Sequence, residues 1–298
     1  MKSKFFESTQ LMPGITAIAG LGGENAYLVE GTKRALLIDG LTGVGSLKAF
    51  VRELTDKPVT LALTHGHIDH NGAAFEYGKC YIHPADLCML YPAPEAETGA
   101  LALSRHTDPA AKLDFVVNGR ILKGDAHGIT IDDVVKACPI ATLPIGEGDV
   151  FDLGDTQIEV LELPGHTAGT VVFLDRARRI VFSGDACNLN TLVGLPGSTS
   201  IEEYRGALER FTRHLDAFDV MYGGHGTHAV DKIIISQAIE LCDKILRRED
   251  DAIESEHRGR KQLLALRRGP NYLPENGMLC NIQYTEEMLH PAKTKKML

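Results

Sequence analysis

The chain has 298 residues, of which 44% are hydrophobic and 24% charged, with a formal net charge of -9. This composition is ordinary for a globular protein with a buried core, and the negative balance argues against nucleic-acid partners, because a phosphate backbone attracts a basic surface. The N-terminus lacks the apolar stretch of a signal peptide, and no run approaches the roughly 20 apolar residues of a membrane helix. We therefore expect a cytoplasmic protein with no membrane contact. The six cysteines form no CxxC pair, and in such a protein we expect them to be reduced thiols.

The first third of the chain predicts short strands with two helices among them. GITAIAG, NAYLVEG and RALLIDG are short, apolar and punctuated by glycines, which is typical of strands. SLKAFVREL, at 46–54, has apolar residues at helical spacing. VTLALT, at 59–64, predicts a buried strand, AAFEYG a short helix, and KCYIHPAD a strand that ends in a turn.

Residues 85–145 have a weaker pattern. Alanine and leucine favour helix near the start of this segment, but prolines at 84, 92 and 94 interrupt it, and ITIDDVVKA fits a helix or a strand. We interpret 85–145 as an insertion or lid within a single domain that spans 1–298. Histidines of such a lid, among them His106, are expected to face solvent.

The second half returns to a regular pattern. Residues 149–166 and 170–187 each predict a hairpin, with turns at Gly154-Asp155 and at Asp175 to Arg178. IEEYRGALERFTRHL predicts an amphipathic helix preceded by serine capping residues, DVMYGGHG a strand and turn, and residues 229–250 a long helix. The tail GMLCNIQYTEEML predicts one edge strand. Basic runs within 247–268 are typical of a solvated helix face, although they could supply cations to a substrate.

Strands therefore cluster in two groups, each followed by helices. Such an order predicts two similar βα halves packed sheet to sheet with helices outside, an α/β sandwich of four layers.

Metal-ligand side chains follow four of the predicted strands. The stretch THGHIDHNG, directly after VTLALT, crowds His65, His67, Asp69 and His70 into one loop. Three later strands lead into glycine-containing turns that carry one ligand-type residue each, namely His166, Asp185 and His225. Strands that end at a common edge would bring all of these side chains together, and glycines allow sharp turns beside a crowded centre.

Seven such side chains are too many for one tetrahedral ion and suffice for two ions that share a carboxylate. Imidazole nitrogen with carboxylate oxygen suits Zn²⁺, with Fe or Mn as alternatives. Asp39 ends the strand RALLIDG. It either supports a metal ligand from behind or caps the turn, and the sequence leaves both readings open.

The sequence resembles the metallo-β-lactamase-fold superfamily in THGHIDHNG, PGHTAG, SGDAC and GGHG, which occur in that order. The resemblance implies an αβ/βα sandwich with a dinuclear site at the sheet edges. It implies that His65, His67 and His166 hold the first metal, that Asp69, His70 and His225 hold the second, and that Asp185 bridges both. It also implies a supporting aspartate at Asp39.

Among branches of that superfamily, the sequence is most similar to the glyoxalase II, thioesterase and lactonase group. The expected reaction is cleavage of a small-molecule thioester, lactone or related ester by a hydroxide held between two metals, with Asp69 orienting it and taking its proton. A mononuclear iron persulfide dioxygenase, a β-lactamase-type amide hydrolase and a metal-stabilised binding protein remain alternatives. The sequence leaves a homodimer possible.

Overall fold

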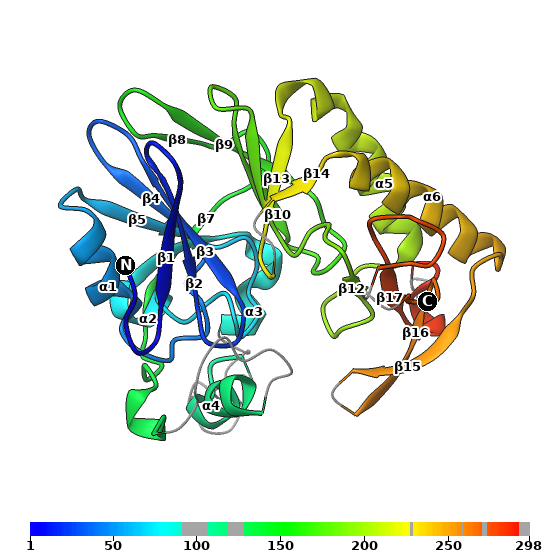
Figure 1. Cartoon of the computed structure of the whole chain (residues 1–298), viewed down its shortest axis with the longest axis horizontal. Coiled ribbons are helices and arrows are strands. Elements are labelled where there is room, and N and C mark those ends of the chain that lie inside the picture. The colour runs from blue at the N-terminus through cyan, green and yellow to red at the C-terminus, as the bar shows by residue number, and fades with distance from the viewer. Residues whose placement is uncertain (91–105, 119–127, 227–228, 258, 270–272, 292–298) are drawn as a thin grey trace, which may run out of the picture.

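The computed structural model describes the chain except at 91–105, 119–127, 227–228, 258, 270–272 and 292–298. Two sheets stack face to face, and helices cover their outer sides (Figure 1). This arrangement is the predicted four-layered α/β sandwich. Within the described residues, no helix has the length and the apolar character needed to cross a bilayer.

The first sheet has seven strands in chain order and includes every strand that the first third of the sequence predicted. Neighbours are antiparallel from β1 to β4 and parallel from β4 to β7. The strands are β1 (Glu7–Met12), β2 (Ile15–Ala19), β3 (Asn25–Glu30), β4 (Ala35–Ile38), β5 (Val59–Ala62), β6 (Lys79–Ile82) and β7 (Ala141–Pro144). Helices α1 (Leu47–Leu54) and α2 (Ala74–Tyr77) lie where SLKAFVREL and AAFEYG predicted them.

The second sheet has the order β14-β13-β11-β10-β9-β8 and contains both predicted hairpins. Its strands are β8 (Val150–Asp152), β9 (Gln157–Glu162), β10 (Val171–Asp175), β11 (Ile180–Gly184), β13 (Val220–Gly223) and β14 (Ala229–Asp231). Every residue of β10 and β11 is buried, because one face packs on the first sheet and the other on helices. Two helices cover this sheet, α5 (Ile201–Phe211) and α6 (Ile233–Arg247). A capping box between Ser200 and Glu203 starts α5, in line with the predicted serine cap.

Three apolar clusters fill the spaces between neighbouring layers. The cluster between the sheets joins Ile15, Tyr27 and Leu36 of the first sheet to Phe173 and Phe182 of the second. A second cluster packs α1 and α2 on the first sheet, and a third packs α5 and α6 on the second. The strands are thus held rigidly, and the loops at their ends inherit fixed positions.

A small third sheet, β12-β17-β16-β15, differs from the sequence-based expectation. Its strands are β12 (Thr191–Val193), β15 (Ile253–His257), β16 (Arg260–Leu264) and β17 (Ile282–Tyr284). The tail strand β17 is paired on both sides, so its prediction as an edge strand is wrong. Part of the basic run forms the β15–β16 hairpin instead of a helix face. The long helix begins at Ile233, because Ala229–Asp231 pairs with β13 as β14.

The segment 85–145, predicted as a lid or insertion, lies partly outside the described residues. Its described parts include 3-10 turns at Pro84–Asp86 and Ile131–Asp133, and helices α3 (Leu87–Leu90) and α4 (Pro109–Val117). The segment returns to the first sheet at β7. Helix α4 lies beyond one end of that sheet (Figure 1).

Candidate metal centre

Four strand ends bring all seven predicted ligand residues to one place. The loop after β5 carries His65, His67, Asp69 and His70. Strands β9, β11 and β13 lead to the other three, His166, Asp185 and His225. Strands β11 and β13 are parallel, so they end at the same edge. The seven side chains fall into three overlapping groups, in each of which the candidate ligand atoms all lie within 4.8 Å of one another.

The first group consists of His65, His67 and His166, which are almost completely buried. Nδ1 of His67 lies 2.8 Å from Nε2 of His166. Burial, together with the neighbouring imidazoles, lowers the pKa of His65 and of His67 well below the ordinary value. Both rings are therefore neutral at physiological pH, and a neutral imidazole has a lone pair to offer to a cation.

A backbone carbonyl orients the third ring of this group. Nδ1 of His166 lies 2.9 Å from the carbonyl oxygen of Leu192 in β12. A carbonyl only accepts, so Nδ1 carries the proton and Nε2 directs its lone pair toward His67. Such a hydrogen bond behind a histidine is typical of metal ligands.

The second group consists of Asp69, His70 and His225. Nε2 of His225 lies 3.1 Å from Oδ2 of Asp69. Burial alone would lower the pKa of His70, but Asp39 and Asp69 outweigh it and raise the pKa to about 9. Burial likewise opposes protonation of His225, whose pKa is nonetheless raised by Asp185 and Asp69. The protons on these two imidazoles compensate the negative charge of the clustered carboxylates. A divalent cation can supply the same positive charge in their place.

Asp185 lies between the two groups. Its Oδ2 is 3.6 Å from Nε2 of His166, which belongs to the first group. The same oxygen is 3.8 Å from Nε2 of His70 and 3.3 Å from Nε2 of His225, which belong to the second. One carboxylate therefore reaches both sets of imidazoles.

Unpartnered polar atoms point to what these side chains are arranged to hold. Nε2 of His65, Nε2 of His70 and Oδ1 of Asp185 are buried without a hydrogen-bond partner in the part of the chain that the structure describes. Leaving three such atoms unpaired costs free energy, so they call for a partner that the polypeptide does not supply. Imidazole nitrogens and carboxylate oxygens are ligands for Zn²⁺, Fe²⁺ or Mn²⁺. The residues fit divalent cations as a class.

Asp39 supports the centre from behind. Its Oδ1 accepts from the backbone N–H of Thr64 at 2.7 Å, and its Oδ2 lies 2.9 Å from Nδ1 of His70. The backbone of Asp39 is left-handed, with φ of 66°. Because Asp39 contacts His70, it does more than cap a turn, which is the other interpretation that the sequence leaves open.

Four polar residues around the centre were not recognised from the sequence. Asp86 accepts a hydrogen bond from the backbone N–H of Gly66, and Asn71 donates one to the backbone carbonyl of Gly66. Lys112, completely buried on α4, donates to Oδ1 of Asn71 at 2.9 Å. His106 was expected to face solvent, but it is half-buried and its ring stacks 5.1 Å from the ring of His67. Asp86 follows a strand as the ligands do, and that signal could have identified it.

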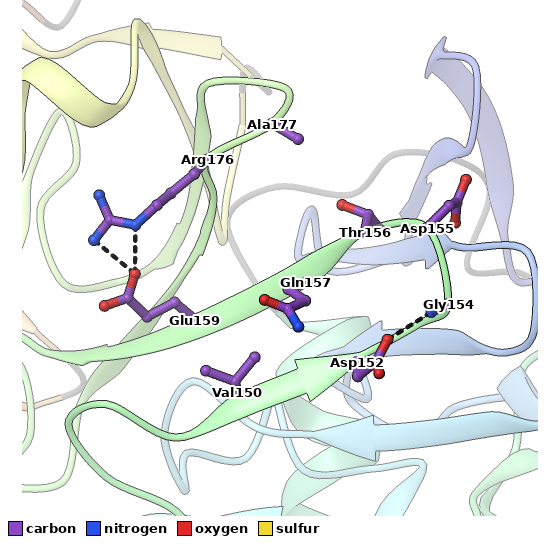
Figure 2. A pocket seen from close by; sticks show the side chains of 9 residues that line it. All are labelled: Val150, Asp152, Gly154, Asp155, Thr156, Gln157, Glu159, Arg176 and Ala177. Atoms are coloured by element: carbon purple, nitrogen blue, oxygen red, sulfur yellow. Dashed lines mark hydrogen bonds and ion pairs between the residues drawn. The ribbon is translucent and has the colours of Figure 1, made fainter.

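A surface recess lies at the opposite end of the second sheet and takes no part in this centre. Val150, Asp152, Gln157 and Arg176 line it, and Figure 2 shows an ion pair there between Arg176 and Glu159. Strand β9 runs from this recess toward His166. The recess offers no cluster of candidate ligands among the residues that the structure describes.

Comparison with known proteins agrees with this geometry. The family model described as the metallo-beta-lactamase superfamily matches residues 19–213. The acyl-coenzyme A thioesterase MBLAC2 of Homo sapiens is 28% identical over 204 residues, which cover 64% of this chain and 68% of that protein. An uncharacterized protein of Mycobacterium leprae is 29% identical over 223 residues, 70% of this chain and 88% of that protein. Among solved structures, a metallo-beta-lactamase from Pontibacter korlensis has a TM-score of 0.54 at 18% identity. The match covers 80% of this chain and 99% of that one, and it shows similarity of fold alone.

Proposed function

Because the chain belongs to the metallo-beta-lactamase superfamily, we propose that it is a metal-dependent hydrolase that cleaves a small-molecule acyl thioester. The observation that carries the proposal is the position of Asp185 within reach of both imidazole groups. This arrangement supports two metal ions side by side instead of one isolated ion. The named relatives that hydrolyse acyl-coenzyme A support the thioester over other esters.

Access to the centre is one-sided. The side chain of His225 is 29% exposed and that of Asp69 is 11% exposed, whereas His65 and His70 are completely buried. A substrate therefore approaches over the second group. Its carbonyl and the attacking water meet on the side where Asp69, Asp185 and His225 face solvent.

Two divalent cations bound here would polarise the substrate carbonyl and lower the pKa of a water molecule to near neutrality. The side chains do the remaining work. Burial alone would raise the pKa of Asp69, but His70 and His225 outweigh it and hold that pKa below its usual range, so the carboxylate is ionised. An ionised, partly exposed carboxylate can accept a hydrogen bond from the attacking water and orient it.

The test is an activity panel on protein reconstituted separately with Zn²⁺, Fe²⁺ and Mn²⁺. Substrates are acyl-coenzyme A thioesters of several chain lengths, S-lactoylglutathione, a lactone and a β-lactam, with thiol release or acid production as the readout. Thioester cleavage that the Asp185→Asn variant loses is the expected result. Asp175→Asn is a matched control, because Asp175 is an equally buried carboxylate at the far turn of the β10–β11 hairpin.

Metal content gives an independent readout of the same proposal. Two metal ions per chain with thioester cleavage support it. One iron per chain with oxygen uptake on glutathione persulfide would replace it with an oxidoreductase. Bound metal without turnover on any substrate of the panel would also overturn it.

A further inference from the structure

The peptide groups around Gly66 are held from both sides by buried side chains. Gly66 lies between two candidate ligands, His65 and His67. Its N–H donates to Oδ2 of Asp86 at 2.9 Å, and its carbonyl accepts from Nδ2 of Asn71 at 3.1 Å. A Cβ at this position would lie 2.9 Å from Cβ of Met89, so the loop has no room to shift there.

Asp86 also binds the loop that carries the third ligand of the first group. Oγ1 of Thr167, the residue after His166, donates to Oδ2 of Asp86 at 2.7 Å. The N–H of Gly169 donates to Oδ1 of Asp86 at 2.9 Å. A Cβ at Gly169 would lie 2.6 Å from that oxygen, so a glycine is what lets the carboxylate approach the backbone. One completely buried carboxylate thus bonds to two separate ligand loops.

The hydrogen-bond pattern requires a carboxylate. All three donors point N–H or O–H groups at Asp86, and an ionised carboxylate consists of acceptors only. An asparagine in its place would turn an NH2 group toward the N–H of Gly66 or toward the N–H of Gly169, depending on its orientation. Either orientation sets two donors against each other in a buried site, which is costly.

We propose that Asp86 is a positioning residue for the first metal site. By bonding to the His65–His67 loop and to the His166 loop at once, it holds the three imidazoles in a convergent arrangement before a cation arrives. The inference rests on the proposed function only in that these three histidines bind a metal ion. Ligand sets held in place beforehand bind metal more tightly, because less conformational freedom is lost on binding.

The second site provides an internal reference. Among the described residues, the side chain of Asp86 bonds to Gly66, Thr167 and Gly169 and not to Asp69, His70 or His225. Replacing Asp86 should therefore weaken the first site selectively. Loss of a supporting residue of this kind lowers metal affinity by about 10-fold to 100-fold.

The experiment measures binding of Co²⁺ to metal-free, full-length protein by visible absorption, without any enzyme assay. His67→Ala and His225→Ala identify which absorption band belongs to which site. In Asp86→Asn, the affinity of the first site should fall about 10-fold to 100-fold while that of the second stays within about 2-fold. Asp175→Asn, which replaces a buried carboxylate outside the centre, should leave the Co²⁺ affinity of both sites unchanged.

A second variant covers the case in which Asp86→Asn does not fold. Thr167→Val keeps the side-chain shape and removes the hydroxyl that bonds to Asp86 and to Oγ1 of Thr170. The first site should therefore weaken in the same direction by a smaller factor. Equal weakening of both sites, or unchanged Co²⁺ binding in the folded variants, would overturn the proposal. A wild-type protein that binds two Co²⁺ but hydrolyses no thioester would count against the proposed function and leave this inference standing.

Discussion

Oδ2 of Asp39 lies 2.9 Å from Nδ1 of His70. A carboxylate cannot donate, so Nδ1 of His70 carries the proton. Nε2 of the same ring, which is buried and unpartnered within the described structure, can then exchange its proton for a cation and offer that cation a lone pair. Asp39 therefore selects the tautomer in which His70 can bind a cation.

Asp39→Asn should reverse that selection. The backbone N–H of Thr64 keeps the amide oxygen on the Oδ1 side, so the NH2 group faces His70 and favours protonation at Nε2. Asparagine adopts the left-handed backbone of this position readily, so the fold should persist. We expect about a 10-fold to 100-fold loss of affinity at the second site, measured by Co²⁺ binding. Wild-type affinity in this variant would show that Asp39 only shapes the turn.

His225→Ala should reduce the metal content from two ions to one per chain. The substitution removes one ligand from the exposed side of the centre without opening a cavity in the apolar core. Thioester turnover should fall at least about 100-fold, because substrate and water meet beside this residue. Elemental analysis with a steady-state assay provides the measurement. His290→Ala is the matched control, since His290 is an exposed histidine bonded to Glu202 on the surface.

Lys112→Met should change how stability depends on pH. Burial lowers the pKa of Lys112 from 10.5 to about 7 in the folded protein, an effect that Asp69 only partly offsets. Between these two values the unfolded chain binds more protons than the folded one, so the wild-type free energy of unfolding rises with pH. Below pH 7, Lys112 adds nothing to the slope of the free energy of unfolding against pH. Above pH 7, it adds at most about 1.4 kcal/mol per pH unit.

The measurement is urea denaturation of metal-free wild type and Lys112→Met from pH 6 to pH 10. The wild type should gain stability relative to the variant as the pH rises above 7. Parallel curves would show that Lys112 is not buried in this way, and with it that α4 does not pack against Asn71.

Gly224→Ala should disturb the centre directly. A Cβ at this position would lie 2.6 Å from Oδ1 of Asp185 and 2.8 Å from Cε1 of His70, so at least one of these side chains must move. We expect metal affinity to fall about 10-fold or more. Gly206→Ala is the control, because its Cβ would meet only Arg210 at 3.5 Å. Alanine there should stabilise α5 by about 0.5–1 kcal/mol.

One rule, that ligand-type side chains follow apolar strands, predicted which seven residues meet. It succeeded because sheet packing fixes where strands end, and the strand pattern is legible in segments such as VTLALT. The same rule missed Asp86, which follows β6 after a short turn. Asn71 and Lys112 carry no such signal, because their contact joins a loop to a helix that is distant in sequence and depends on tertiary packing.

Errors in the predicted elements have a similar origin. The β15–β16 hairpin consists largely of charged and polar residues, since much of its surface faces solvent, and charge runs alone do not separate a strand from a helix face. Apolar spacing that continues through Ala229–Asp231 predicts the start of α6 there, whereas pairing with β13 decides the conformation of this segment. Likewise, the partners of β17 come from segments whose own pairing could not be predicted.

The carbonyl of Leu192 that orients His166 belongs to β12, and β12 is paired with β17 near the end of the chain, Leu192 opposite Gln283. Strand β17 contributes no candidate ligand, yet it pairs with the strand that supplies this carbonyl. A defect in the small third sheet would therefore disturb the ring orientation of His166 at a distance, through its backbone pairing alone.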